Sequence, residues 1–102
     1  MIRISTEEAA RLIAQGDHDL VDVREPHEWA GGHIPGARHV PLGALARAPA
    51  DHLTRDRVIF VCGHGMRSQT ACAIARGAGL SQVFSVDGGV VGWAAEGRPL
   101  AA

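Results

Sequence analysis

The seven residues Cys-Gly-His-Gly-Met-Arg-Ser, at positions 62–68, combine side chains and glycines that can build a reactive site. Cys62 follows an apolar run at residues 57–61, which is typical of a buried strand. The alanine-rich segment at residues 67–78 is expected to be a helix. The stretch is therefore a strand-to-helix loop that begins with a potential nucleophile, since a cysteine thiolate attacks electrophiles.

The loop composition favours a thiol site. Gly63 and Gly65 allow the backbone to curl tightly, so that several N–H groups converge on one point near the positive end of the following helix dipole. Such a field stabilises the thiolate of Cys62 over the thiol. Arg67 is expected to hold an oxyanion such as a sulfonate with two hydrogen bonds. The alternatives are that Arg67 is tied to a nearby carboxylate as loop scaffold and that Cys62 is a buried structural residue.

The same loop also resembles a phosphate-binding turn. Gly63-x-Gly65-x-x-Ser68 lies between a strand and a helix, and Asp87 follows 22 residues after Gly65, about where a ribose-binding acid belongs in a dinucleotide fold. The third glycine is, however, Ser68, and the 15 residues after Asp87 are too few for a second nucleotide-binding half. The sequence therefore favours the thiol site over the nucleotide site.

Composition limits the protein class further. With 102 residues, 46% of them hydrophobic, the chain is expected to form one domain over residues 1–102. A net charge of -1 gives no electrostatic case for nucleic acid, and no segment has the apolar length of a membrane helix or the apolar core of a signal peptide. A cytoplasmic location is the resulting expectation, with no membrane partner.

Two further counts exclude particular chemistries. All ten basic residues are arginine, so neither a Walker lysine nor a Schiff-base lysine is present. Cys62 and Cys72 are ten residues apart, a spacing that fits neither a disulfide scaffold nor a common zinc site, so no metal is expected. Cys72 is expected to be a small buried residue of the alanine-rich helix, with a resolving thiol as the alternative.

Strand and helix patterns alternate along the chain. Strands are expected at residues 2–4, 19–23, 37–40, 57–61 and 82–86, and helices at residues 6–14, 25–30, 42–46, 67–78 and 90–95, with a polar link at 51–56. Ser5 and Glu8 form a capping box for the first helix, and Gly16 ends it. Alternation of this kind predicts an open α/β fold with a mainly parallel five-stranded sheet and helices on both faces. Ligands collect at the carboxyl ends of such strands, where Arg24, Cys62 and Asp87 begin loops.

Three separated segments resemble the signatures of the rhodanese family of sulfurtransferases. They are Asp22-Val23-Arg24-Glu25 with Glu28-Trp29 and Gly32-His33-Ile34-Pro35-Gly36-Ala37, then Cys62-x-x-Gly65-x-Arg67-Ser68, then Asp87-Gly88-Gly89 with Trp93. The resemblance spans nearly the whole chain in the expected order. It implies a single-domain rhodanese with no organic cofactor and no metal.

The resemblance also implies a reaction. Cys62 would take the outer sulfur of thiosulfate or a similar small donor as a persulfide, and a thiol, a protein cysteine or cyanide would accept it. The family's phosphatase and arsenate-reductase relatives have five residues between the cysteine and the arginine, whereas four separate Cys62 from Arg67. By resemblance, the persulfide would be held by the loop residues Gly63, His64, Gly65, Met66, Arg67 and Ser68, and Asp22 and Arg24 would form the framework of the site.

One departure and two rival functions qualify this interpretation. Thiosulfate-type loops of the family often have a basic residue directly after the cysteine, whereas this chain has Gly63 and then His64. A rhodanese-fold module that binds an anion or senses sulfur without turnover is one rival. A Cys-His hydrolase is the other, although none of the six histidines is placed by sequence beside Cys62. His33 is expected to be a structural, hydrogen-bonded residue of a turn.

Overall fold

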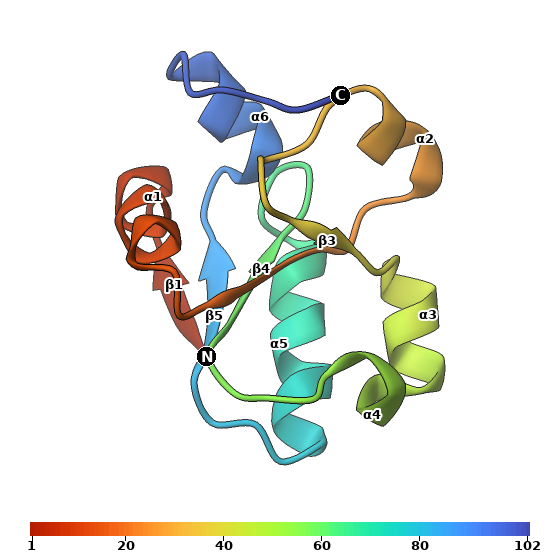
Figure 1. Ribbon diagram of the computed structural model, residues 1–102. Coiled ribbons are helices and arrows are strands. Elements are labelled where there is room, and N and C mark those ends of the chain that lie inside the picture. Colours follow the sequence, from red (N-terminus) through yellow and green to blue (C-terminus); the bar gives the residue numbers. More distant parts are fainter.

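A computed structural model describes residues 1–102, in which strands and helices alternate from the N-terminus (Figure 1). The strands are β1 (Ile2–Ile4), β2 (Asp19–Asp22), β3 (Arg38–His39), β4 (Val58–Val61) and β5 (Val83–Val86). The helices are α1 (Thr6–Gln15), α2 (Pro26–Ala30), α3 (Leu42–Arg47), α4 (Pro49–His52), α5 (Arg67–Gly77) and α6 (Gly89–Ala95). No helix is both long enough and apolar enough to span a membrane.

The five strands form one sheet in the order β1-β5-β4-β2-β3, and every pair is parallel. This arrangement confirms the predicted open α/β fold, with the sheet entirely rather than mainly parallel. Helices connect the strands because parallel neighbours need a crossover from one end of the sheet to the other. The order places the ends of β2, β4 and β5 next to one another, as the sequence predicts for the loops that leave them.

The core lies on both faces of the central strand β4, whose four residues are all buried. Phe60 belongs to the cluster beneath α3 and α5, which includes Leu45 and Ala75. Ile59 belongs to the opposite cluster, beneath α1 and α6, with Trp93. Successive residues of a strand point to opposite faces, so this strand is apolar throughout. Helices therefore cover both faces, as predicted.

The polar link predicted at residues 51–56 is partly wrong, because its first two residues belong to α4. Pro49 occupies the first turn of that helix, where its fixed φ fits and its missing N–H is not needed. Leu53, directly after the helix, is buried in the core. The rest of the link is held by Asp56, whose carboxylate accepts hydrogen bonds from the backbone N–H groups of Ser81 and Gln82.

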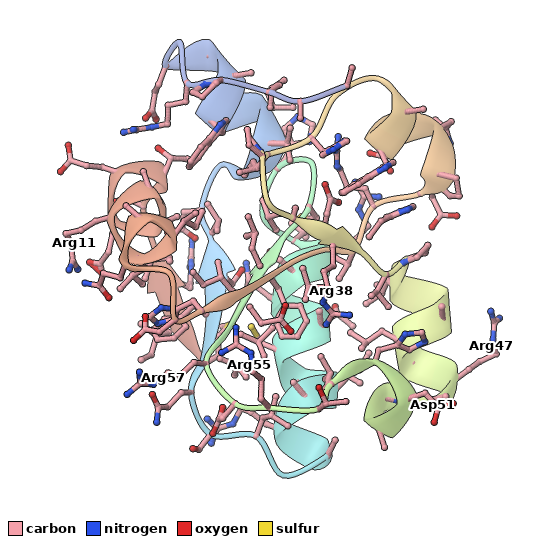
Figure 2. All side chains as sticks on the ribbon, in the orientation of Figure 1. Arg11, Arg38, Arg47, Asp51, Arg55 and Arg57 are labelled. Carbon is pink, nitrogen blue, oxygen red and sulfur yellow. The ribbon has the colours of Figure 1, made fainter.

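Two arginines form ion pairs with acidic residues near the start of β2; Figure 2 labels both, Arg38 and Arg57. Arg57 pairs with Asp17 at 2.8 Å, and Arg38 pairs with Asp19 at the same distance. Asp17 precedes β2, Asp19 is its first residue, and Arg57 directly precedes β4. These ion pairs tie the amino ends of the strands together, away from the reactive loop.

Candidate active site

Three loops meet at the carboxyl edge of the sheet. The backbone N–H of Val90, in the first turn of α6, donates to the Cys62 carbonyl at 2.8 Å, and that of Val91 donates to the Gly63 carbonyl at 3.1 Å. On the other side, Arg67 pairs with Glu28 of α2. The loops after β2 and β5 therefore clamp the Cys62 loop from two sides.

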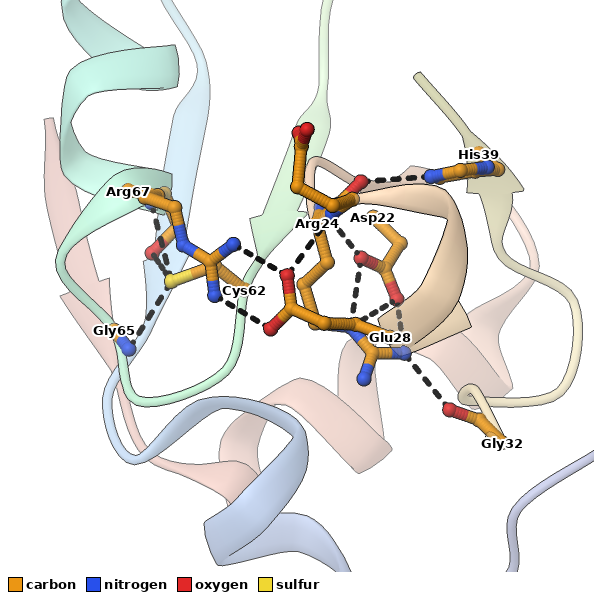
Figure 3. Close-up of polar contacts among 10 residues, drawn as sticks. Asp22, Arg24, Glu28, Gly32, His39, Cys62, Gly65 and Arg67 are labelled. Carbon is orange, nitrogen blue, oxygen red and sulfur yellow. Dashed lines mark hydrogen bonds and ion pairs between the residues drawn. The ribbon is translucent and has the colours of Figure 1, made fainter. Parts of the chain in front are cut away.

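The sulfur of Cys62 lies at the centre of this loop, and the residue is 1% exposed. Its Sγ accepts hydrogen bonds from the backbone N–H groups of Gly65 and Ser68, at 3.2 and 3.3 Å (Figure 3). The Ser68 hydroxyl lies 3.6 Å from Sγ. Ser68 is in the first turn of α5, so the positive end of that helix also faces the sulfur.

These contacts shift the ionisation of the thiol. Burial alone raises the pKa of Cys62, because it disfavours the charged thiolate. The hydroxyl and N–H of Ser68, together with the N–H groups of Gly65 and His64, oppose burial, and the net pKa lies below its ordinary value of 9.0. The loop therefore stabilises the nucleophilic form of the cysteine.

The remaining amides of the loop make no backbone hydrogen bond. They are the N–H groups of Gly63, His64, Met66 and Arg67. The resemblance implied that the loop from Gly63 to Ser68 acts as one cradle for a persulfide. In the structure the N–H groups of Gly65 and Ser68 donate to Sγ at 3.2 and 3.3 Å, and that of His64 also contributes to lowering the pKa of the thiol. The N–H groups of Gly63, Met66 and Arg67 have no backbone acceptor.

Two glycines give the loop its shape. Gly65 has a φ of 108°, and a Cβ there would lie 3.2 Å from the Val86 carbonyl oxygen. Gly89 has a φ of 58°, and a Cβ there would overlap the carbonyl oxygens of Cys62 and Gly63. Only glycine allows α6 to approach the loop this closely and cap both carbonyls. With both carbonyls capped from this side, the N–H groups of Gly65 and Ser68 donate to the sulfur.

Arg67 forms a bidentate ion pair with Glu28, through Nη1 to Oε1 at 2.6 Å and Nη2 to Oε2 at 2.9 Å. Figure 3 shows the guanidinium facing this carboxylate beside the Cys62 loop. Hydrogen bonding to Arg67 lowers the pKa of Glu28 to about 2, and the same bonds raise the pKa of Arg67. The sequence left two roles open for Arg67, binding of an oxyanion and pairing with a nearby carboxylate. The structure shows the carboxylate pair, and donor binding by Arg67 stays a prediction.

Gly63 lies close to both side chains of the Arg67–Glu28 ion pair. A Cβ at position 63 would lie 3.0 Å from Arg67 Nη2 and 3.7 Å from Glu28 Oε2. A larger side chain there would have to displace the guanidinium. The position where the chain departs from the basic pattern of the family is therefore the one that makes room for the Arg67–Glu28 pair.

Asp22 and Arg24 form a buried ion pair at the end of β2, at 0% and 6% exposure. Arg24 Nη2 lies 2.9 Å from Asp22 Oδ2 and also donates to the Gly32 carbonyl at 2.8 Å. His39 donates through Nε2 to the Arg24 carbonyl at 2.7 Å. Both charges are satisfied by protein groups, and the pair links β2 to the turn after α2, next to the reactive loop.

The histidines lie apart from the sulfur. His33 stacks flat on Trp29, with ring centroids 3.5 Å apart, and its Nδ1 lies 3.3 Å from the Trp29 carbonyl oxygen. The side chains of His64 and Met66 point out to solvent, and Met66 is 79% exposed. The groups that hydrogen-bond Cys62 Sγ are backbone amides and a hydroxyl, and no histidine ring is among them.

The second cysteine differs sharply from the first. Cys72 is fully buried in α5, and burial raises the pKa of its thiol to about 11. Neither cysteine is in a disulfide. The contrast follows from the surroundings, since no hydrogen-bond donor offsets the burial of Cys72. No group of three or more His, Cys, Asp or Glu side chains is placed to hold a metal ion.

Sequence reasoning did not assign a role to Glu28, Ser85 or Gly89. Glu28 lies three residues after Glu25, whose N–H it caps, and this helix-start spacing is a signal that could have drawn attention to it. Ser85 is the one hydroxyl in the apolar strand β5, and its buried side chain lies 2.7 Å from Ser68 Oγ. No sequence signal identifies the close approach at Gly89, because it depends on how α6 docks.

Comparison with known proteins gives consistent matches over the whole chain. Residues 5–96 match the family model of the rhodanese-like domain. A protein of Pseudomonas entomophila named thiosulfate sulfurtransferase GlpE is 41% identical over 91 residues, which cover 89% of this chain and 83% of that protein.

Solved structures agree in fold. A rhodanese-related protein of Thermoplasma volcanium superposes with a TM-score of 0.87 at 30% identity, covering 99% of this chain and 98% of that one. The human single-domain sulfurtransferase TSTD1 superposes with a TM-score of 0.80 at 28% identity, covering 94% and 97%.

Proposed function

The chain belongs to the rhodanese-like domain family, and we propose that it is a sulfurtransferase that carries a sulfane sulfur on Cys62. The observation that supports this most is the Cys62 loop, in which hydrogen bonds lower the pKa of the thiol. The likeness to proteins named thiosulfate sulfurtransferase, at 34 to 41% identity, supports thiosulfate as the donor.

The first half-reaction loads the enzyme. The Cys62 thiolate attacks the outer sulfur of thiosulfate, a new S–S bond forms at Sγ, and the bond between the two thiosulfate sulfurs breaks with its electron pair leaving on sulfite. The outer sulfur keeps its own negative charge, so the loaded enzyme carries a persulfide anion, and the additional charge leaves with sulfite. The loop lowers the pKa of the Cys62 thiol, and a cysteine that reacts as its thiolate needs no separate base.

The loop amides are suited to that outer atom. The N–H groups of Gly65 and Ser68 hold Sγ, and those of Gly63, Met66 and Arg67, which have no backbone acceptor, would donate to the terminal sulfur. Donors fixed in advance around a developing anion stabilise it without reorganising at the moment of reaction. The four-residue interval between Cys62 and Arg67 makes a cradle for one sulfur atom rather than for a tetrahedral oxyanion.

The second half-reaction unloads the enzyme. An acceptor thiolate or cyanide attacks the outer sulfur, the bond from Sγ to that sulfur breaks, and its electron pair returns to Cys62 as the thiolate. A small thiol or a protein cysteine is the acceptor we propose in the cell. The cycle is a ping-pong reaction with no organic cofactor and no metal.

A donor and acceptor panel tests the proposal. Sulfite release from thiosulfate is measured with cyanide, small thiols and a protein dithiol as acceptors, for the wild type, Cys62→Ala and Cys72→Ala. We expect turnover in the wild type and in Cys72→Ala and none in Cys62→Ala. Cys72→Ala is the matched control, since it removes a buried thiol that makes no hydrogen bond to the reactive sulfur.

Two results would count against a sulfurtransferase. Turnover that survives Cys62→Ala would place the chemistry elsewhere. Loading of Cys62 without transfer to any acceptor in the panel would instead support a sulfur-sensing or anion-binding module that uses the same loop without turnover.

A further inference from the structure

Ser85 of β5 is connected to the reactive sulfur through the hydroxyl of Ser68. Ser85 pairs with Phe60 across the sheet, and its residue is fully buried. Side chains two residues apart on a strand share a face, so Ser85 is on the same side of the sheet as Val83, which packs in the cluster that contains Cys62. The Ser85 hydroxyl thereby reaches the first turn of α5.

The hydroxyls of Ser85 and Ser68 form a two-step link to the sulfur. Their oxygens are 2.7 Å apart, and Ser68 Oγ lies 3.6 Å from Cys62 Sγ. All three residues are at most 1% exposed, so water does not compete for these hydrogen bonds. This contact with Ser68 is the one side-chain hydrogen bond that Ser85 makes.

The charge on Cys62 fixes the direction of the link, because each hydroxyl has one hydrogen to donate. A thiolate accepts only, so Ser68 donates to Sγ, and the bond between the two serines then uses the hydrogen of Ser85. With a neutral thiol the chain can run the other way, from S–H to Ser68 and from Ser68 to Ser85. When the hydrogen bonds run from the thiol toward Ser85, the hydroxyl hydrogen of the buried Ser85 has no acceptor among the side chains.

The two directions are therefore unequal. A buried polar hydrogen without an acceptor costs the desolvation of that group, while the direction toward the sulfur satisfies every donor. A donor that itself accepts a hydrogen bond is also polarised and donates more strongly. Ser85 thus favours the arrangement that serves an anion on sulfur, without touching the sulfur.

We propose that Ser85 is a positioning residue for the sulfur chemistry, whose hydroxyl holds the Ser68 hydroxyl in the orientation that donates to Cys62. The inference rests on the proposed function, since it concerns the thiolate that function uses. It assigns a reason for a serine in the interior of an apolar strand. The same link serves the enzyme each time the thiolate is regenerated.

The test is a pH titration of the Cys62 thiolate by its ultraviolet absorbance, in full-length protein carrying Cys72→Ala. The chain contains two cysteines and no tyrosine, so the only remaining thiolate is that of Cys62 and no tyrosinate overlaps it. We expect Ser85→Ala to raise the titration midpoint by about half a pH unit, which is about threefold less thiolate below the midpoint. Ser85→Thr, which keeps the hydroxyl, should have a titration midpoint close to that of the wild-type residue.

A double-mutant cycle separates positioning from packing. In a Ser68→Ala background, Ser85→Ala should leave the midpoint where Ser68→Ala alone puts it, because the link is already broken. An unchanged midpoint in Ser85→Ala, or a shift of equal size in the Ser68→Ala background, would overturn the proposal. The readout does not depend on sulfur transfer, so a wild type that fails to load sulfur while Ser85→Ala still shifts the titration would refute the function and leave this inference standing.

Discussion

Replacing Glu28 with glutamine would release Arg67 from its charged partner without shortening the side chain at position 28. The carboxylate occupies both terminal nitrogens of the Arg67 guanidinium, at 2.6 and 2.9 Å. This is the geometry in which arginine binds other oxyanions, including sulfonates. We therefore predict that Glu28 competes with thiosulfate for Arg67, and that Glu28→Gln improves the donor half-reaction.

The size of the effect follows from the exposure of the ion pair. The side chains of Arg67 and Glu28 are 37% and 27% exposed, so solvent screens much of their attraction, and a bidentate pair of this kind is worth about 1 kcal/mol. Removing that competition corresponds to about a fivefold gain in the rate of donor capture. A glutamine oxygen can still accept from the N–H of Glu25, as Glu28 Oε1 does at 3.0 Å, so the start of α2 is kept.

The assay compares kcat/KM for thiosulfate with kcat/KM for cyanide, since each reports its own half-reaction in a ping-pong cycle. We expect Glu28→Gln to raise the value for thiosulfate about fivefold and to leave the value for cyanide within about twofold. The gain should shrink at high salt, because it is electrostatic. Glu7→Gln is the matched control, as it removes one negative charge from an exposed position on α1.

The opposite outcome has a clear meaning. If Glu28→Gln leaves kcat/KM for thiosulfate unchanged, or lowers it together with the value for cyanide, then Arg67 does not bind the donor. Arg67 would in that case serve as loop scaffold, and the prediction of donor binding from the sequence would be wrong.

Three further predictions concern the framework of the site. Gly89→Ala should lower the free energy of unfolding by more than about 2 kcal/mol, because its Cβ would overlap the carbonyl oxygens that α6 caps, while Gly16→Ala, at a φ of 82° with open space around it, should cost only about 1 kcal/mol. Asp22→Asn should cost about 3 kcal/mol in a denaturant titration, since it leaves the Arg24 charge buried without its partner. The pKa of Glu28 falls from 4.5 to about 2 on folding, so the ionised carboxylate stabilises the folded protein fully above pH 4.5 and this contribution is lost toward pH 2. The stability difference between wild type and Glu28→Gln, measured by thermal melting, should therefore shrink to nearly zero as the pH falls from 4.5 to about 2. A difference that persists at pH 2 would show that the ion pair is not its source.

The sequence predicted the parallel sheet and the position of Cys62 correctly because both depend on local patterns. The run of apolar residues that forms β4 and the glycines that follow it are short-range signals. Helix α4 was not predicted, because it has only four residues and is followed by Leu53, whose burial within a polar segment depends on tertiary packing.

The partners of the site were less predictable than its nucleophile. Arg67 and Glu28 are 39 residues apart in the chain, and Ser68 and Ser85 are 17 apart, so their pairing requires the docking of α2 and β5 around the loop. Charge and residue type suggested a carboxylate partner for Arg67 but could not choose among the 11 acidic residues. Long-range contacts of this kind follow from strand order, which local pattern does not fix.

Intact-mass measurement after a single exposure to thiosulfate tests the central claim most directly. The protein is mixed with the donor in the absence of an acceptor, separated from it and weighed. We predict that the wild type and Cys72→Ser gain the mass of one sulfur atom, that Cys62→Ser gains none, and that adding cyanide removes the extra mass. A wild type that gains no sulfur, or a gain that persists in Cys62→Ser, would contradict the assignment of Cys62 as the sulfur carrier.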